Sequence, residues 1–180
     1  LWIPVLEFLS LKEALPQASF VDASSVLWQL RMIKSRAEVE LIRQAGLINF
    51  RALRRTFAEL SEGCSEKEIT KLVCKYLVEE GAWRPPHTQI QVVTQAKAQS
   101  KGHRSRMQGP SDDVLRRGDI LFIDSGAIYD SYWGEFNRIA VVGEPTHRQA
   151  ECHHKIRTVV KRSIEEAFRP GNSYRRIIEQ

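Results

Sequence analysis

Two acidic residues in a strand-forming stretch are the candidates for chemistry in this sequence. Asp124 and Glu135 lie eleven residues apart in the stretch 118–143, which reads GDILFIDSGAIYDSYWGEFNRIAVVG. Apolar runs, LFI and RIAVVG, flank a polar centre, and this pattern predicts a β-hairpin. We expect Asp124 and Glu135 to lie opposite each other across the hairpin, at one end of a sheet. Two carboxylates placed in this way can bind a divalent metal ion.

Helices with polar caps precede and follow this hairpin. Three capping boxes mark helix N-termini, each with Ser or Thr followed three residues later by Glu or Gln: Ser35 with Glu38, Ser65 with Glu68, and Thr146 with Gln149. We expect the first helix to end near Gly63 and the second at Gly81, because glycine favours helix C-termini. The third helix should run to about Phe168, and Ser173 should cap a last helix.

Strands are predicted at two further places. TQIQVVT, residues 88–94, alternates apolar and polar positions as a half-buried strand does. A short strand is also expected at 19–22. From the first capping box onward the order is helix, helix, strand, hairpin, helix, helix. This order predicts an α+β fold in which helices pack on one face of an antiparallel sheet.

The composition is that of an ordinary globular protein, with 42% hydrophobic and 27% charged residues. The net charge of +5 is spread over short clusters without interleaved aromatic residues, so we do not expect nucleic-acid binding. Cys64, Cys74 and Cys152 form no CxxC pair, which favours a reducing compartment and a cytoplasmic location. No stretch approaches the ~20 apolar residues of a membrane helix, so no membrane partner is expected.

Four stretches resemble, in the same order, the metallopeptidase family that contains Xaa-Pro aminopeptidase, prolidase, methionine aminopeptidase and creatinase. They are LRMIKSRAEVELIRQAGLI, SEGCSEKEITKLV, SDDVLRRGDILFIDSGAIYDSYWGEFNRIAVVGEPT and AFRPGNSYRRI. The resemblance covers residues 29–180 and implies the N-terminal half of the pita-bread fold, whose two similar αβ halves enclose the active site. It also implies that residues 1–28 are the end of an N-terminal creatinase-type domain or a linker, and that the chain is a fragment.

The resemblance gives Asp124 and Glu135 the role of metal ligands. The family uses five ligands, Asp, Asp, His, Glu and Glu. Asp124 matches the first, in a D-x-G motif, and Glu135 matches the second. The other three belong to the second half of the fold, beyond Gln180. The implied cofactor is a divalent metal, Mn, Co, Zn or Mg, with two ions in the whole protein and an absent or partial site in this chain.

Two positions depart from the family pattern. Glu135 stands where the family has Asp, so the site has adjusted to Glu, binds one metal, or binds none. Met107 stands where an ungapped alignment of PSDDVLRRGD places a substrate-binding histidine, and methionine has no N–H donor. His103, four residues upstream, is therefore the candidate for a catalytic role. Met107, Tyr132 and Arg138 are the candidates for substrate binding.

Three functions remain open at this point. The first is a hydrolase of the Xaa-Pro aminopeptidase or prolidase type, which cleaves a peptide bond with a hydroxide that bridges two metals. The second is a creatinase-like C–N hydrolase or a lyase that acts on a small non-peptide substrate. The third is a non-catalytic pita-bread binding module. We expect the whole protein to be an enzyme and a homodimer with a peptide or small-molecule substrate, and this chain alone to be inactive.

Overall fold

The computed structural model describes residues 3–84, 88–93 and 109–178 of the chain. These residues fall into two compact units, Leu1–Val39 and Glu40–Gln180. Each unit is described by itself below. Within the described residues, no helix is both long and apolar enough to cross a membrane.

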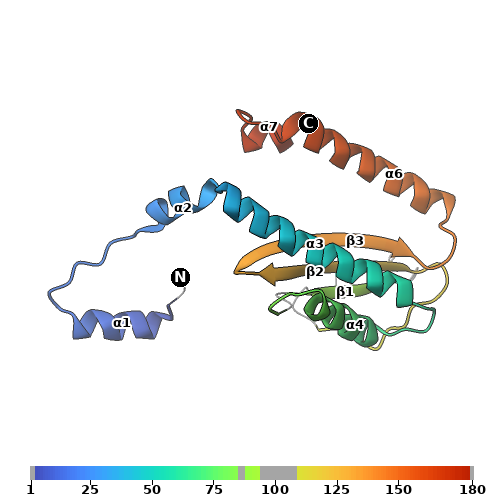
Figure 1. The fold of residues 1–180 in the computed structure, drawn as a ribbon, viewed down its shortest axis with the longest axis horizontal. Coiled ribbons are helices and arrows are strands. Elements are labelled where there is room, and N and C mark those ends of the chain that lie inside the picture. Colours follow the sequence, from blue (N-terminus) through green and yellow to red (C-terminus); the bar gives the residue numbers. More distant parts are fainter. Residues whose placement is uncertain (1–2, 85–87, 94–108, 179–180) are drawn as a thin grey trace. The chain divides into compact units, whose positions relative to one another are not determined.

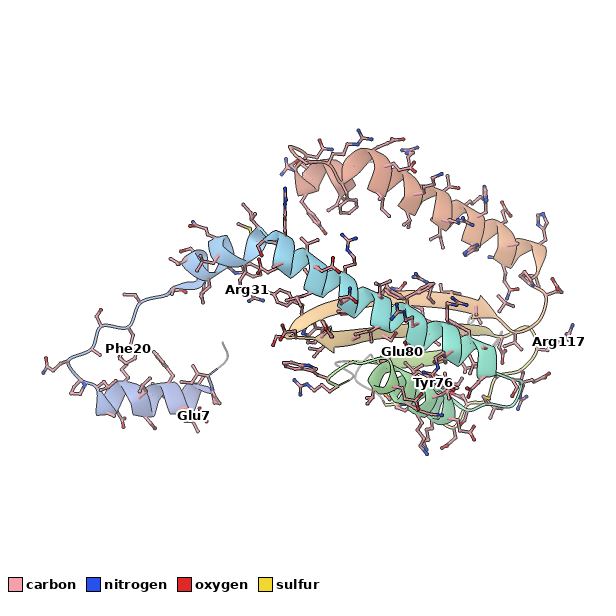
Figure 2. The ribbon with its side chains drawn as sticks, in the orientation of Figure 1. Glu7, Phe20, Arg31, Tyr76, Glu80 and Arg117 are labelled. Atoms are coloured by element: carbon pink, nitrogen blue, oxygen red, sulfur yellow. The ribbon has the colours of Figure 1, made fainter. Side chains whose placement is uncertain are left out.

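The first unit contains helices α1 (Val5–Ala14) and α2 (Ser24–Met32). The ring of Phe20, which is labelled in Figure 2, packs edge-on against a ring of α1. This second ring belongs to Phe8, and the two centroids are 5.5 Å apart. The strand expected at 19–22 was wrong, because these residues form neither helix nor strand. Asp22 instead accepts a hydrogen bond of 2.8 Å from the Ser24 amide, and such local side-chain bonds compete with strand pairing.

The second unit is built on an antiparallel sheet with the strand order β1-β2-β3. The strands are β1 (Thr88–Val93), β2 (Ile120–Tyr129) and β3 (Tyr132–Val141). Helices α3 (Arg36–Glu59) and α4 (Glu66–Glu79) run alongside this sheet (Figure 1). After β3 come α6 (His147–Arg162), the π-helical turn η1 (Ser163–Ala167) and α7 (Tyr174–Ile178). The predicted α+β order of elements is therefore confirmed.

The capping boxes form as predicted and set where the helices begin. In α4, the Glu68 amide donates to Ser65 Oγ at 3.2 Å, and the Ser65 amide donates to Glu68 Oε2 at 2.8 Å. The same reciprocal pairs begin α3, between Ser35 and Glu38, and α6, between Thr146 and Gln149. Each pair satisfies two amides that a helix N-terminus would otherwise leave unbonded.

A two-residue turn joins β2 to β3. Asp130 and Ser131 both have positive φ, of 45° and 69°, which is the conformation of a type I′ turn. This turn matches the right-handed twist of the flanking strands and fixes their register, with Tyr129 paired to Tyr132 and Ile120 paired to Val141. The predicted hairpin is therefore confirmed.

The core lies between the helices and one face of the sheet. Alternate residues of β2, namely Leu121, Ile123 and Ala127, are each at most 1% exposed and belong to a single apolar cluster. The helices contribute residues at helical spacing to the same cluster: Ile48, Ala52 and Leu53 from α3, and Ile69, Val73, Tyr76 and Leu77 from α4. The prediction that helices pack on one face of the sheet is confirmed.

Helices α3 and α4 are also joined at their outer edge. The Arg55 guanidinium donates to Glu79 Oε2 at 2.6 Å and to Glu80 Oε1 at 3.0 Å, and it lies 4.0 Å from the centre of the Tyr76 ring. The Tyr76 hydroxyl donates in turn to the Glu59 carboxylate. Figure 2 labels Tyr76 of α4 and Glu80, the residue that directly follows this helix. These contacts hold the two helices together beside the core.

Candidate metal-binding face

The two predicted metal ligands lie on the same face of the sheet, away from α3 and α4. Successive side chains of a strand point to opposite faces, so Asp124 lies on the face opposite Ile123. Asp124 pairs with Asn137, and Glu135 pairs with Gly126. Paired residues share a face, which places both carboxylates on the surface away from the core. Asp124 is half-buried there, and Glu135 is exposed.

The register corrects one expectation, that Asp124 and Glu135 lie directly opposite each other. They are diagonal neighbours, because Asp124 faces Asn137, two residues beyond Glu135. The turn explains the difference: it is centred on Asp130 and Ser131. An eleven-residue spacing would give a direct pair only if the turn were centred one residue earlier. Diagonal neighbours on paired antiparallel strands are about 7–8 Å apart. The side chains of Asp124 and Glu135 can therefore still reach a common point between them.

The donor atoms on this face suit a hard divalent cation. Carboxylate oxygens come from both predicted ligands, and the Asn137 amide lies directly across from Asp124. Oxygen donors of this kind are the ones preferred by Mg²⁺ and Mn²⁺. Within the described residues, however, no group of three or more His, Cys, Asp or Glu side chains could hold a metal ion. The two carboxylates are thus of the donor type that a divalent metal prefers, but the described residues do not supply a complete set of ligands.

The other predicted site residues lie elsewhere. Arg138 pairs with Ile123, so the register places it on the helix-side face, where its guanidinium donates to the Asn137 carbonyl at 2.8 Å and lies 4.4 Å from the Phe136 ring centre. Tyr132 is half-buried at the start of β3. The structure brings neither residue to the carboxylate face. His103 and Met107 fall outside the described residues.

A buried hydrogen-bond network lies behind the carboxylates, and sequence reasoning missed it. Asn49 of α3 is 0% exposed, and its Nδ2 donates to the carbonyls of Ser125, at 2.7 Å, and Gly134, at 3.3 Å. The Ser125 hydroxyl donates back to Asn49 Oδ1 at 2.7 Å. Ser125 directly follows Asp124, and Gly134 directly precedes Glu135. The sequence signal for this network was Asn49 itself, a polar residue among the apolar positions of α3.

Helix α3 reaches the hairpin because Gly134 has no side chain. A Cβ placed on Gly134 would lie 2.2 Å from the Gly46 nitrogen and 2.4 Å from the Ala45 carbonyl carbon. Real Cβ atoms do not approach backbone this closely. The close contact of the two backbones therefore requires glycine at position 134, one residue before Glu135.

A second buried polar residue, Glu66 at the start of α4, connects strand β1 to the segment that precedes β2. Its side chain is fully buried and accepts hydrogen bonds from the Val92 amide at 2.8 Å, the Ser111 amide at 2.8 Å and the Ser111 hydroxyl at 2.7 Å. In the sequence, Glu66 looked like an ordinary acid in the first turn of a capped helix. Nothing in the local pattern signalled its distant partners.

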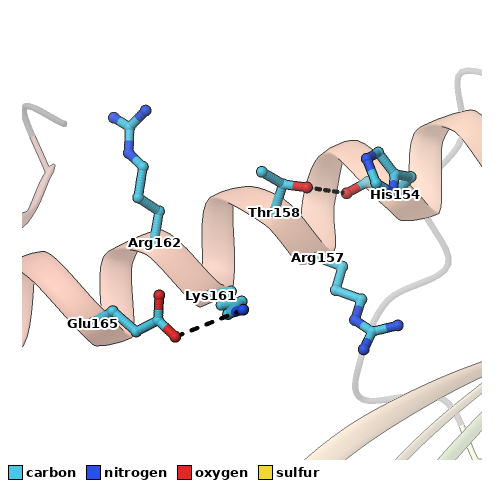
Figure 3. Close-up of a pocket in the computed structure, with 6 residues that line it drawn as sticks. All are labelled: His154, Arg157, Thr158, Lys161, Arg162 and Glu165. Atoms are coloured by element: carbon cyan, nitrogen blue, oxygen red, sulfur yellow. Dashed lines mark hydrogen bonds and ion pairs between the residues drawn. The ribbon is translucent and has the colours of Figure 1, made fainter.

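The hollow drawn in Figure 3 lies along α6 and η1 and has a basic lining. Its six lining residues are His154, Arg157, Thr158, Lys161, Arg162 and Glu165. The Thr158 hydroxyl donates to the His154 carbonyl at 2.9 Å, and Lys161 pairs with Glu165 at 3.8 Å (Figure 3). The lining side chains are more than half exposed where they form ion pairs, which is typical of a solvated helix face.

Comparison with known proteins identifies relatives that match most of this chain. The sequence pattern of metallopeptidase family M24 matches residues 40–180. An Xaa-Pro dipeptidase from Pyrococcus furiosus is 32% identical over 162 residues, which are 89% of this chain and 44% of that protein. An Xaa-Pro dipeptidase from Pyrococcus horikoshii is 30% identical over 154 residues. The chain thus spans less than half the length of these two relatives.

Solved structures show the same fold. The prolidase from Pyrococcus furiosus superposes with a TM-score of 0.77 at 31% identity, over 93% of this chain and 49% of that one. An X-Pro aminopeptidase from Thermotoga maritima superposes with a TM-score of 0.77 at 28% identity, over 89% of this chain and 44% of that one. The described structure therefore corresponds to the N-terminal half of the pita-bread fold, as the resemblance implied.

Proposed function

Because the chain belongs to metallopeptidase family M24, we propose that the whole protein is a metal-dependent hydrolase that cleaves Xaa-Pro peptides. The observation that carries this proposal is the pair of carboxylates on the open face of a hairpin with prolidase-like structure. The named relatives are dipeptidases and an aminopeptidase. They give no support to a creatinase-like reaction or to a non-catalytic binding module.

Asp124 and Glu135 are the residues of this chain that would hold the metal. When bound, divalent cations of this kind lower the pKa of a coordinated water and polarise a substrate carbonyl. The two strands present the carboxylates from a rigid sheet, which limits their movement. Gly126, the partner of Glu135, has no side chain to compete for the space beside it. The extra methylene of Glu135 gives it additional reach across the diagonal.

Several further features of the whole protein belong to the same proposal. Residues 1–28 are the end of an N-terminal creatinase-type domain or a linker, and residues 29–180 are half of the catalytic domain. The whole protein is a cytoplasmic homodimer that binds two ions of Mn²⁺, Co²⁺, Zn²⁺ or Mg²⁺. Cys64, Cys74 and Cys152 form no disulfide within the described part of the chain, which supports a reducing location. His103 has a catalytic role, and Met107 contacts substrate. Tyr132 and Arg138 lie on the helix-side face of β3, away from the carboxylates, so we do not assign them a substrate contact.

The test is hydrolysis of Xaa-Pro dipeptides by the whole protein, first stripped of metal and then supplied with each ion in turn. We expect activity with at least one ion and a loss of at least about 100-fold in Asp124→Asn, since a ligand is removed. Asp112→Asn is the matched control, because Asp112 is an exposed acid paired with Lys67 away from this face. Absence of turnover with all four ions would contradict the proposal.

A further inference from the structure

We propose that Asn49 is a positioning residue for the carboxylate pair: it fixes α3 to both strands of the hairpin and so sets how Asp124 and Glu135 project. For its effect on metal binding, this inference rests on the proposed function. Its structural part, the placement of the hairpin by Asn49, does not depend on any metal.

The network has the geometry that this role requires. The Asn49 Nδ2 bridges two strands, since one of its acceptors is the Ser125 carbonyl in β2 and the other is the Gly134 carbonyl in β3. The Ser125 hydroxyl completes the set by donating to Asn49 Oδ1. Each bonded strand residue is the sequence neighbour of a carboxylate residue. A displacement of either strand relative to α3 would therefore break a buried bond next to a candidate ligand.

The neighbouring contacts leave little freedom at this point. Gly134 lies directly against the α3 backbone at Gly46, so the hairpin cannot move closer to the helix. The buried amide of Asn49 opposes movement in the other direction, because a strand carbonyl that lost its donor would be buried without a partner. Ser125, which faces α3, is itself 0% exposed. Metal sites lose function when ligands are misplaced by about half an ångström, so this restraint has consequences on the opposite face.

Another buried polar residue of the same helix shows what a purely structural role looks like. Thr56 is also 0% exposed, but its hydroxyl donates to the Ala52 carbonyl within α3 at 2.9 Å. Thr56 therefore bonds within its own helix, and among the described residues its hydroxyl donates to Ala52 and not to a strand. Thr56 is therefore a matched control: it is as buried as Asn49 and lies in the same helix, but its hydrogen-bond partner is in that helix and not in a strand.

The experiment compares Asn49→Ala with Thr56→Ala in the whole protein, by two measurements. The first is amide hydrogen exchange along β2 and β3 without metal. The second is the Kd for Mn²⁺ from calorimetric titration. We expect Asn49→Ala to accelerate exchange at residues 124–126 and 134–136, and to weaken Mn²⁺ binding about tenfold, as loss of a supporting hydrogen bond does at known metal sites. Thr56→Ala should lower Tm without either change.

Ser125→Ala is the milder second variant if Asn49→Ala does not fold. It removes only the hydroxyl donor, and we expect it to weaken Mn²⁺ binding in the same direction by a few-fold. Equal effects of the Asn49 and Thr56 variants on both measurements, or an unchanged Kd and exchange in Asn49→Ala and Ser125→Ala, would overturn the inference. If the wild-type protein binds no Mn²⁺, the proposed function fails, and hydrogen exchange alone then decides whether Asn49 positions the hairpin.

Discussion

Gly134 of β3 and Gly46 of α3 form an asymmetric backbone contact. A Cβ on Gly134 would lie 2.2 Å from the Gly46 nitrogen, whereas a Cβ on Gly46 would meet no atom within 4 Å. The two glycines are neighbours in space, but only position 134 requires glycine, because only there would a Cβ collide with backbone. Substitution of each by alanine should therefore change stability in opposite directions.

Gly134→Ala should lower the free energy of unfolding by about 3 kcal/mol, because α3 and β3 must separate to admit the methyl group. Gly46→Ala should raise it by up to about 1 kcal/mol, since alanine is the better helix former. Urea denaturation of both variants beside the wild type measures the two effects. A Gly134→Ala variant as stable as the wild type would show that the contact is not tight in solution.

Glu66→Gln should lower the free energy of unfolding by about 2 kcal/mol, because it weakens charge-assisted hydrogen bonds to buried partners. The Glu66 carboxylate accepts from Val92 and from both the amide and the hydroxyl of Ser111. An amide at this position would turn an N–H₂ group toward one of these donors. Glu68→Gln, in the same helical turn but exposed, is the control and should have a smaller effect at neutral pH. Equal losses in the two variants would argue against a special role for Glu66.

Glu68 should make the stability of α4 depend on pH. Hydrogen bonds from the Ser65 amide and hydroxyl lower the pKa of Glu68. Its folded pKa is then below its unfolded pKa, so its stabilising contribution is present above the unfolded value and disappears as pH falls through the folded value. Thermal melts from about pH 7 down to about pH 3 should show the wild type losing its Tm advantage over Glu68→Gln. A Tm difference that does not change with pH would contradict this reasoning.

Ser131→Gly should stabilise the hairpin by about 0.5–1 kcal/mol, because the residue has a φ of 69°. Left-handed backbone strains residues that carry a Cβ, and glycine relieves that strain at some entropic cost in the unfolded chain. Ser131→Val should destabilise, since a β-branched side chain tolerates this conformation poorly. The Tm of the two variants, compared with that of the wild type, tests both signs.

Local sequence signals correctly predicted most of the helices and strands from Ser35 onward. The capping boxes at Ser35, Ser65 and Thr146 depend only on residues three positions apart, so they can be recognised without the fold. The hairpin was predicted for the same reason, from two apolar runs around a polar turn. The exact pairing was not, because it depends on which two residues adopt positive φ, and neither Asp130 nor Ser131 is glycine.

Features that depend on distant partners could not be predicted. Asn49 and Ser125 are 76 positions apart, and Glu66 and Ser111 are 45 positions apart. No local pattern identifies such pairs. The strand expected at 19–22 failed for a related reason. A β-rich run becomes a strand only when another strand lies beside it, and Asp22 makes a local bond to Ser24 instead.

The alternation of β2 has a consequence for how this protein can be altered. Leu121, Ile123, Ser125 and Ala127 face the helices, whereas Asp124 and Gly126 lie on the other side with the partners Asn137 and Glu135. Neighbouring residues of one strand are therefore under different constraints, since one set packs in the core and the other lies on the face away from the helices. Side chains on the face away from the helices can be substituted one at a time, while the residues that face the helices keep the hairpin in place. Glu135, which stands where the family resemblance implies Asp, would be a change of this kind.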